Sequence, residues 1–274
     1  MSIHIPEASL IFMTISLIIA FGVPLALFLW LLLKKKAAVF PFFVGCGVMF
    51  LFAFLLEGLA HRVILGSAIG DIIQNQLWLY ALYGGLMAGL FEETGRLIAF
   101  KTLLRRYSDK RISSLMYGAG HGGFEAIALA GVAMVSNLIL AINVNSGNYE
   151  VLISDLPTEA AEQIRTAVQT LSETQPYLFL YSGIERISAI TLHLSFSVMV
   201  WAAANRSGKM SFYFLAIGLH ALVDCVTVLL SGSGVSATVL EIIIAALAIM
   251  IAVLTRRIWV SDSSGETAAL SEKE

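Results

Sequence analysis

Long apolar runs constrain the fold of this chain more than any other feature of its sequence. A helix needs about 20 predominantly apolar residues to cross the roughly 30 Å hydrocarbon core of a bilayer. Seven stretches reach that length, at 9–33, 38–60, 77–104, 113–144, 177–204, 211–231 and 236–259. The sequence therefore predicts an all-α fold, a polytopic membrane helical bundle of about seven transmembrane helices.

The composition agrees with a membrane protein. Hydrophobic residues make up 58% of the chain, charged residues 13%, and the mean hydropathy is +0.85, well outside the balance of a soluble domain. A net charge of -2 gives no indication of a nucleic-acid partner, so we expect the lipid bilayer to be the main surrounding. Cys46 and Cys225 lie in apolar segments without CxxC spacing, which favours packing roles over a disulfide or a zinc finger.

The distribution of lysine and arginine predicts the orientation. Cytoplasmic ends of spans are enriched in these residues. With the N-terminus outside, the outer face holds only Arg62 and Arg165, and every cluster of basic residues falls on the other face. If one span were counted wrongly, the clusters would be divided between the two faces. The cytoplasmic face then holds Lys34 to Lys36, Lys101, Arg105, Arg106, Lys110, Arg111, Arg206, Lys209, Arg256 and Arg257. We expect the C-terminus in the cytoplasm.

The sequence predicts a single transmembrane domain, 1–260, followed by a disordered cytoplasmic tail, 261–274, that is rich in Ser, Glu and Ala. The only long hydrophilic connection, 145–176, is acidic and lies on the outer side. Within it, Pro157 precedes apolar residues at helical spacing, which predicts a short amphipathic surface helix. This segment is either a solvated loop or a lid that controls access.

Ionisable side chains inside the predicted spans indicate a functional site. A charge near the bilayer centre costs roughly 2.5 to 3.5 kcal/mol on insertion scales, so such residues usually face a bundle interior and pair with one another. The third, fourth and sixth spans carry Glu92, Glu93, Arg96, His121, Glu125, His220 and Asp224.

Spacing and depth favour one polar cluster. Residues four apart share a helix face, which predicts pairing of Glu92 with Arg96, of His121 with Glu125, and of His220 with Asp224. From the inferred cytoplasmic ends, a rise of about 1.5 Å per residue places these side chains at depths of roughly 12 to 20 Å. His193 of the fifth span falls in the same layer and is interpreted as a lining residue. Glu57, His61 and Arg62 are interpreted as interfacial. Glu185 and Arg186, near the outer end of their span, are expected to pair with one another or to interact with the outer loop.

Three motifs carry a resemblance to a known family. They are Glu92-Glu93-Thr94-Gly95-Arg96, Tyr117-Gly118-Ala119-Gly120-His121 followed by Glu125, and His220-Ala221-Leu222-Val223-Asp224. Over roughly residues 80–230 the chain resembles the CAAX-protease and bacteriocin-processing superfamily, and within it the YhfC-like intramembrane peptidases, relatives of PrsW and of the gamma-secretase subunit APH-1. The short gap between Glu93 and Arg96, and Asp224 where asparagine is common, are more similar to the PrsW and YhfC branches. The resemblance implies a CAAX-protease-like core and a prokaryotic cell membrane, but not a prenylated substrate.

The resemblance implies an intramembrane endopeptidase acting on a membrane-embedded or membrane-associated protein or peptide. Glu92 or Glu93 would serve as general base, while Arg96 orients the other carboxylate. His121 would position the attacking water. His220 and Asp224 would orient one another and stabilise the oxyanion.

A metal-dependent mechanism stays open beside the metal-free one. In it, His121, His220 and one glutamate, Glu93, hold a divalent metal such as zinc, with water in the fourth position. The sequence has no HExxH motif to decide between them, and it implies no other cofactor. A non-catalytic APH-1-like scaffold and a proton-coupled transporter are the alternative functions, and the oligomeric state is open.

Overall fold

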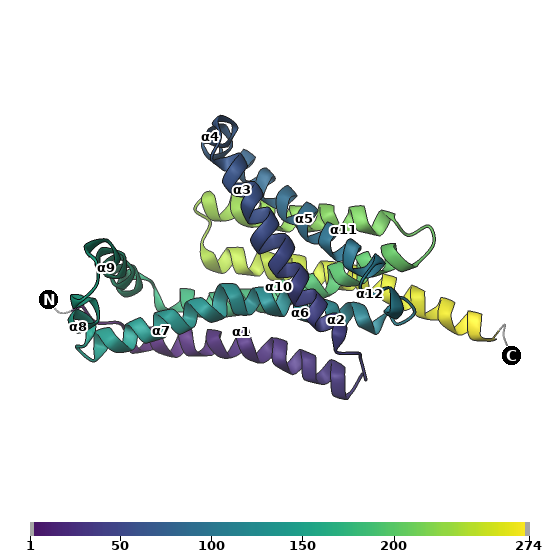
Figure 1. Ribbon diagram of the computed structural model, residues 1–274, viewed down its shortest axis with the longest axis horizontal. Coiled ribbons are helices and arrows are strands. Elements are labelled where there is room, and N and C mark those ends of the chain that lie inside the picture. The colour runs from purple at the N-terminus through teal and green to yellow at the C-terminus, as the bar shows by residue number, and fades with distance from the viewer. Residues whose placement is uncertain (1–2, 272–274) are drawn as a thin grey trace. The chain divides into compact units, whose positions relative to one another are not determined.

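The computed structural model describes residues 3–271, and these residues contain helices and no strand (Figure 1). The elements are α1 (Glu7–Leu33), α2 (Phe40–Val48), π-helical η1 (Met49–Glu57), α3 (Gly58–Leu65), α4 (Ala68–Gln74), α5 (Leu77–Lys101), 3-10 helix η2 (Arg105–Tyr107), α6 (Ile112–Ala126), π-helical η3 (Ile127–Gly131), α7 (Val132–Asn145), α8 (Tyr149–Ser154), α9 (Thr158–Glu173), α10 (Pro176–Asn205), α11 (Ser211–Gly232) and α12 (Ala237–Ser271).

Six helical segments among the described residues are long and apolar enough to cross a membrane. They are Glu7–Leu33, Phe40–Leu65, Ile112–Asn145, Pro176–Asn205, Ser211–Gly232 and Ala237–Val260. The predicted polytopic helical bundle is thus confirmed. The remaining predicted span corresponds to α5, whose 25 residues are long enough to cross. It carries three charged side chains within two helical turns, Glu92, Glu93 and Arg96, and all three are buried.

The predicted single domain, 1–260, is divided in the structure into two compact units. The first comprises residues 3–23 and 125–187 of the described chain, and the second comprises residues 24–124 and 188–271. The boundaries fall inside α1, α6 and α10. The predicted tail continues α12 with helical backbone as far as Ser271, and its last three residues lie outside the described residues.

The first unit encloses an apolar core between the start of α1, α7, α9 and the start of α10. Met13, Ala141 and Val168 are fully buried in it. Helix α9 forms where the sequence predicts an amphipathic helix after Pro157. Because Val168 and Leu171 belong to the core, the apolar face of α9 is packed against protein. The helix is therefore an integral part of this unit.

In the second unit, glycines bring α5 close to α11. The two helices run side by side (Figure 1), and a Cβ added to Gly89 would lie only 2.8 Å from the carbonyl oxygen of Ile217. A Cβ on Gly85 would clash with the carbonyl oxygen of Ala221. Small residues permit such backbone approach in membrane helices. This packing sets the distance between the acidic residues of α5 and His220 of α11.

Gly85→Ala is expected to destabilise the protein by about 1 to 3 kcal/mol, because the added methyl group has no space against α11. The matched control is Gly84→Ala, since a Cβ at Gly84 meets no atom within 4 Å. Alanine favours a helix over glycine by about 0.5 to 1 kcal/mol, so the control should be neutral or stabilising. Thermal unfolding of the purified variants measures both effects, and equal melting temperatures would contradict the close approach.

Candidate functional site

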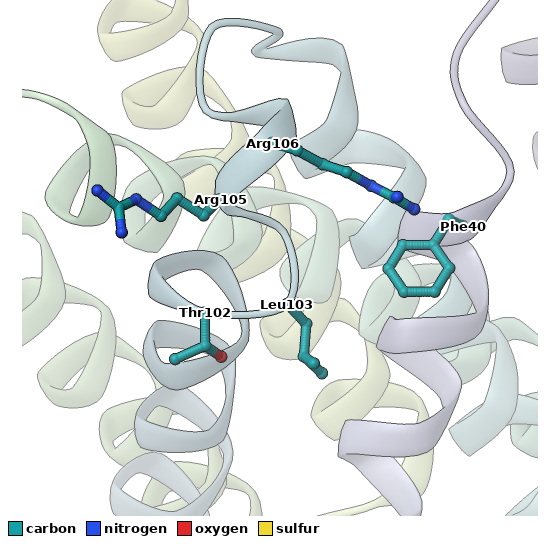
Figure 2. A pocket seen from close by; sticks show the side chains of 5 residues that line it. All are labelled: Phe40, Thr102, Leu103, Arg105 and Arg106. Carbon is teal, nitrogen blue, oxygen red and sulfur yellow. The ribbon is translucent and has the colours of Figure 1, made fainter.

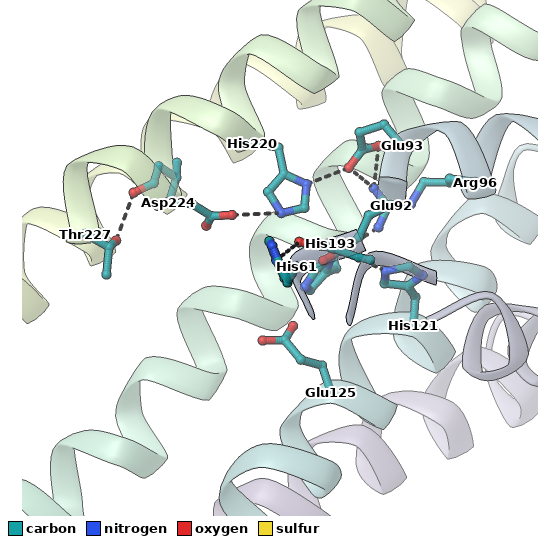
Figure 3. Close-up of polar contacts among 12 residues, drawn as sticks. His61, Glu92, Glu93, Arg96, His121, Glu125, His193, His220, Asp224 and Thr227 are labelled. Atoms are coloured by element: carbon teal, nitrogen blue, oxygen red, sulfur yellow. Dashed lines mark hydrogen bonds and ion pairs between the residues drawn. The ribbon is translucent and has the colours of Figure 1, made fainter. Parts of the chain in front are cut away.

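The candidate site lies inside the second unit, where α5, α6, α10 and α11 contribute ionisable side chains (Figure 3). Glu93, Arg96 and His121 are fully buried. Glu92, His193 and His220 have exposed fractions of only 5 to 6%. Buried charged groups that lie this close together must pair with one another. The structure shows two connected networks of hydrogen bonds and ion pairs.

The first network surrounds Glu93. Both of its carboxylate oxygens accept hydrogen bonds from Arg96 Nη1, at 2.5 Å for Oε2. Oε1 also accepts from His220 Nδ1 at 2.8 Å. On the other edge of that imidazole, Nε2 lies 3.5 Å from Asp224 Oδ2. Glu93 is therefore neutralised and held in place, which suits a positioning role better than a role as base.

The second network joins Glu92 to two histidines. His121 Nε2 donates to Glu92 Oε2 at 2.9 Å, and His193 Nδ1 lies 3.8 Å from the same oxygen. One ligand atom from each of these three residues lies within 4.8 Å of the other two. The rings of His121 and His193 are 4.9 Å apart between centroids.

Arg96 connects the two networks. Its Nη2 donates to His193 Nδ1 at 3.2 Å, while Nη1 is bound to Glu93. The Tyr117 hydroxyl lies 3.4 Å from His121 Nδ1, one turn earlier on α6. Neighbouring polar groups thus fix the orientation of both histidines, with Arg96 donating to His193 and His121 donating to Glu92.

The glycines of α6 make room for α10. A Cβ on Gly122 would lie 3.0 Å from the Cβ of His193, and one on Gly118 would lie 2.9 Å from the Cα of Leu194. The glycine-rich sequence around His121 therefore serves helix packing, and this packing brings His193 next to His121.

The structure shows partners for Arg96 and Glu125 other than those that the spacing predicts. Arg96 is bound to Glu93, three residues away, where the sequence predicts pairing with Glu92. Successive residues of a helix differ by about 100° in direction, so the adjacent carboxylates of Glu92 and Glu93 enter different networks. The predicted contact between His220 and Asp224 is present.

Glu125 is engaged in the first unit. Its Oε1 accepts from Arg186 Nη1 at 2.7 Å, and Arg186 Nη2 donates to Glu185 at 2.5 Å. The pair of Glu185 and Arg186 is one of the two alternatives that the sequence predicts for them, whereas for Glu125 the sequence predicts His121 as the partner. A spacing of four residues permits such a pair without selecting it, because a longer side chain from another helix can compete.

Sequence reasoning underestimated His193 and Glu57. The sequence predicts only a lining role for His193, although its predicted depth falls in the same layer as that of the other histidines. Glu57, interpreted as interfacial, is 7% exposed and interacts electrostatically with Glu92, His220 and Asp224. Its Oε1 lies 3.2 Å from His61 Nε2. The spacing of four residues between Glu57 and His61 is the signal that could have indicated their pairing, although not the burial of Glu57.

The chemistry of Glu92, His121 and His193 fits a divalent metal. Two imidazoles and one carboxylate, with one position left for water, form a ligand set found in catalytic zinc sites. This group differs from the predicted ligands His121, His220 and Glu93, because Glu93 is bound to Arg96 and His220.

Comparison with known proteins adds an independent observation. The family model described as YhfC intramembrane metalloprotease matches residues 15–245. The Bacillus subtilis (strain 168) protein named "Uncharacterized membrane protein YhfC" is 35% identical over 248 residues, which cover 89% of this chain and 94% of that protein. No solved structure matches the chain significantly.

Proposed function

Since this chain belongs to the YhfC intramembrane metalloprotease family, as its three motifs predict, we propose that it is an endopeptidase that cleaves a membrane-embedded or membrane-associated protein or peptide. The observation that carries the proposal is the buried group of Glu92, His121 and His193 within a bundle of apolar helices. Charged and polar groups at such positions are costly and usually functional.

In this proposal, Glu92, His121 and His193 hold the metal. A zinc ion bound there would supply an activated water and would polarise the carbonyl of the scissile peptide bond. The family description and the donor set both support this choice over the metal-free mechanism. The metal-free form would retain Glu92 as the general base, oriented by its hydrogen bond with His121.

The Glu93 network would position the reacting groups. Arg96 is anchored on Glu93, which fixes the guanidinium that contacts His193. Its Nε is a buried donor with no acceptor among the described residues. A buried donor left unpaired costs about 1 to 3 kcal/mol, so a water or a substrate carbonyl beside it would be stabilised.

His220 is placed to stabilise developing negative charge. It donates to Glu93 through Nδ1, and its contact with Asp224 through Nε2 is at the distance limit of a hydrogen bond. A donor held this loosely can turn to an oxyanion at small cost, and such donors contribute strongly to acyl-transfer catalysis. With the N-terminus outside the membrane, as the sequence predicts, this site would be reached from the cytoplasmic side.

Zinc content separates the proposed ligand set from the set predicted by sequence. Protein purified with zinc is expected to retain about one ion per chain, and His193→Ala should lose most of it, because one of three protein ligands is gone. His220→Ala is the matched control and should retain zinc, since His220 contacts Glu93 and Asp224. Elemental analysis after dialysis measures both. Retention by His193→Ala together with loss by His220→Ala would contradict the proposed ligands.

A scaffold or a transporter would behave differently. An APH-1-like scaffold should fold without cleaving any membrane peptide, and a proton-coupled transporter should drive flux in liposomes. Cleavage of a transmembrane reporter peptide by the reconstituted wild type therefore supports the protease, and its absence in well-folded protein favours one of these alternatives.

A further inference from the structure

A second polar feature of the same unit lies away from the buried histidines, where α5 ends and α2 begins (Figure 2). A pocket of about 660 Å³ is lined there by Phe40, Thr102, Leu103, Arg105 and Arg106. Its lining combines two cationic side chains with two large apolar ones. Proteolysis as proposed above does not use any of them.

Arg106 is held by two aromatic rings. Its Cζ lies 4.7 Å from the ring centroid of Phe40 and 4.9 Å from that of Tyr107. Stacking against aromatic faces fixes the plane of a guanidinium and leaves its N–H edge available to an anion. Figure 2 shows Arg105 extending in a different direction, away from Phe40.

The positive charge of the pocket is not balanced by protein. Among the side chains that the structure describes, no carboxylate forms an ion pair with Arg105 or Arg106. The segment 101–110 carries four basic side chains, Lys101, Arg105, Arg106 and Lys110, and one acidic side chain, Asp109, so its net charge is positive. An anion is therefore the complementary ligand.

The pocket lies at the end of a candidate membrane span. Phe40 is the first residue of the candidate span Phe40–Leu65. The side chains of Phe40 and Leu103 are 40% and 59% exposed, although both are apolar. Exposed apolar groups next to unpaired arginines, at the end of a span, match the boundary between acyl chains and headgroups.

We propose that this pocket binds the headgroup of an anionic phospholipid. Arg106 would donate to the phosphate oxygens through its planar edge, an arrangement that suits a guanidinium better than an ammonium. Phe40 and Leu103 would contact the glycerol and the first methylene groups. An acidic peptide from water would not explain the exposed apolar side chains. Arg105 contributes only to the general positive potential.

The test uses the full chain in detergent with phosphatidylglycerol and phosphatidylcholine as probes. Native mass spectrometry is expected to show selective retention of phosphatidylglycerol by the wild type. Arg106→Ala should reduce this retention on the order of fivefold. Arg106→Lys should reduce it less, because lysine keeps the positive charge but lacks the planar guanidinium that stacks on Phe40 and Tyr107. Arg256→Ala, at an exposed arginine of the same unit that does not line this pocket, is the matched control and should retain most of the lipid.

Several results would overturn the assignment. They are equal retention of the two lipids by the wild type, unchanged retention by Arg106→Ala, and equal losses in Arg256→Ala and Arg106→Ala. Displacement by inorganic phosphate would identify a free anion as the ligand, and displacement by an acidic peptide would identify a protein partner. If Arg106→Ala does not fold, Phe40→Leu removes one stacking ring with the arginine intact, and should also weaken retention.

Discussion

Replacing Glu92 by glutamine is expected to reduce cleavage of a transmembrane reporter peptide on the order of 10³-fold. Glu92 is the carboxylate shared by His121 and His193, at 2.9 and 3.8 Å from their ring nitrogens. The amide keeps the shape of the side chain but cannot act as a base, and it is a weak metal ligand. Rates in proteoliposomes, measured at saturating peptide, report the effect on the chemical step.

The control for this variant is Glu173→Gln on α9, where the side chain is exposed and contacts Gln169. Its cleavage rate should equal that of the wild type. Both variants should melt at the wild-type temperature within a few degrees. A Glu92→Gln protein that folds and still cleaves at the wild-type rate would remove Glu92 from the mechanism.

Arg96→Met is expected to lower stability by about 3 to 5 kcal/mol, because it leaves the buried carboxylate of Glu93 without its cation. Arg96 and Glu93 are both fully buried, and the guanidinium binds both carboxylate oxygens. The double variant Glu93→Leu with Arg96→Met should recover part of the loss, since it removes both charges. Thermal and denaturant unfolding in detergent measure these differences.

Arg62→Met is the matched control, because Arg62 is exposed near the end of α3. A surface change of this kind should shift stability by no more than about 0.5 kcal/mol. If Arg96→Met is as stable as this control, the ion pair is not the element that holds Glu93. A double variant less stable than Arg96→Met alone would show that other contacts of these side chains outweigh the charge.

The membrane-spanning segments could be predicted because each one depends mainly on the residues of its own segment. A helix in lipid satisfies its own backbone hydrogen bonds, so apolar length alone indicates where it runs. Helix α5 is the informative exception, since Glu92, Glu93 and Arg96 interrupt its apolar character. These three charges lower the hydropathy of α5, and they also identify α5 as the helix at the centre of the site. Its crossing of the membrane, and the orientation of the termini, stay predictions.

The partners within the site could not be predicted to the same extent. Spacing indicates which residues of one helix share a face, but it does not select between Glu92 and Glu93 as the partner of Arg96. That selection depends on His121, His193 and the close approach of α6 to α10, which are properties of packing. His193 became a proposed ligand only when its ring was found beside that of His121.

The burial of Glu57 could not be predicted for another reason, which is an irregularity in the helix that carries it. The sequence predicts one uninterrupted span over 38–60, whereas the structure contains the π-helical segment η1 at Met49–Glu57. A π-helical segment has a wider turn than an α-helix and changes which residues share a face. Glu57 ends this segment and is buried, and regular helical periodicity cannot anticipate that orientation.

The position of bound zinc tests the central proposal most directly. A structure of the zinc-loaded protein, with data collected at the zinc absorption edge, is expected to show one anomalous peak within bonding distance of Glu92, His121 and His193. A peak beside Glu93 and His220 instead, or no peak in protein that cleaves its substrate, would contradict the proposed metal centre.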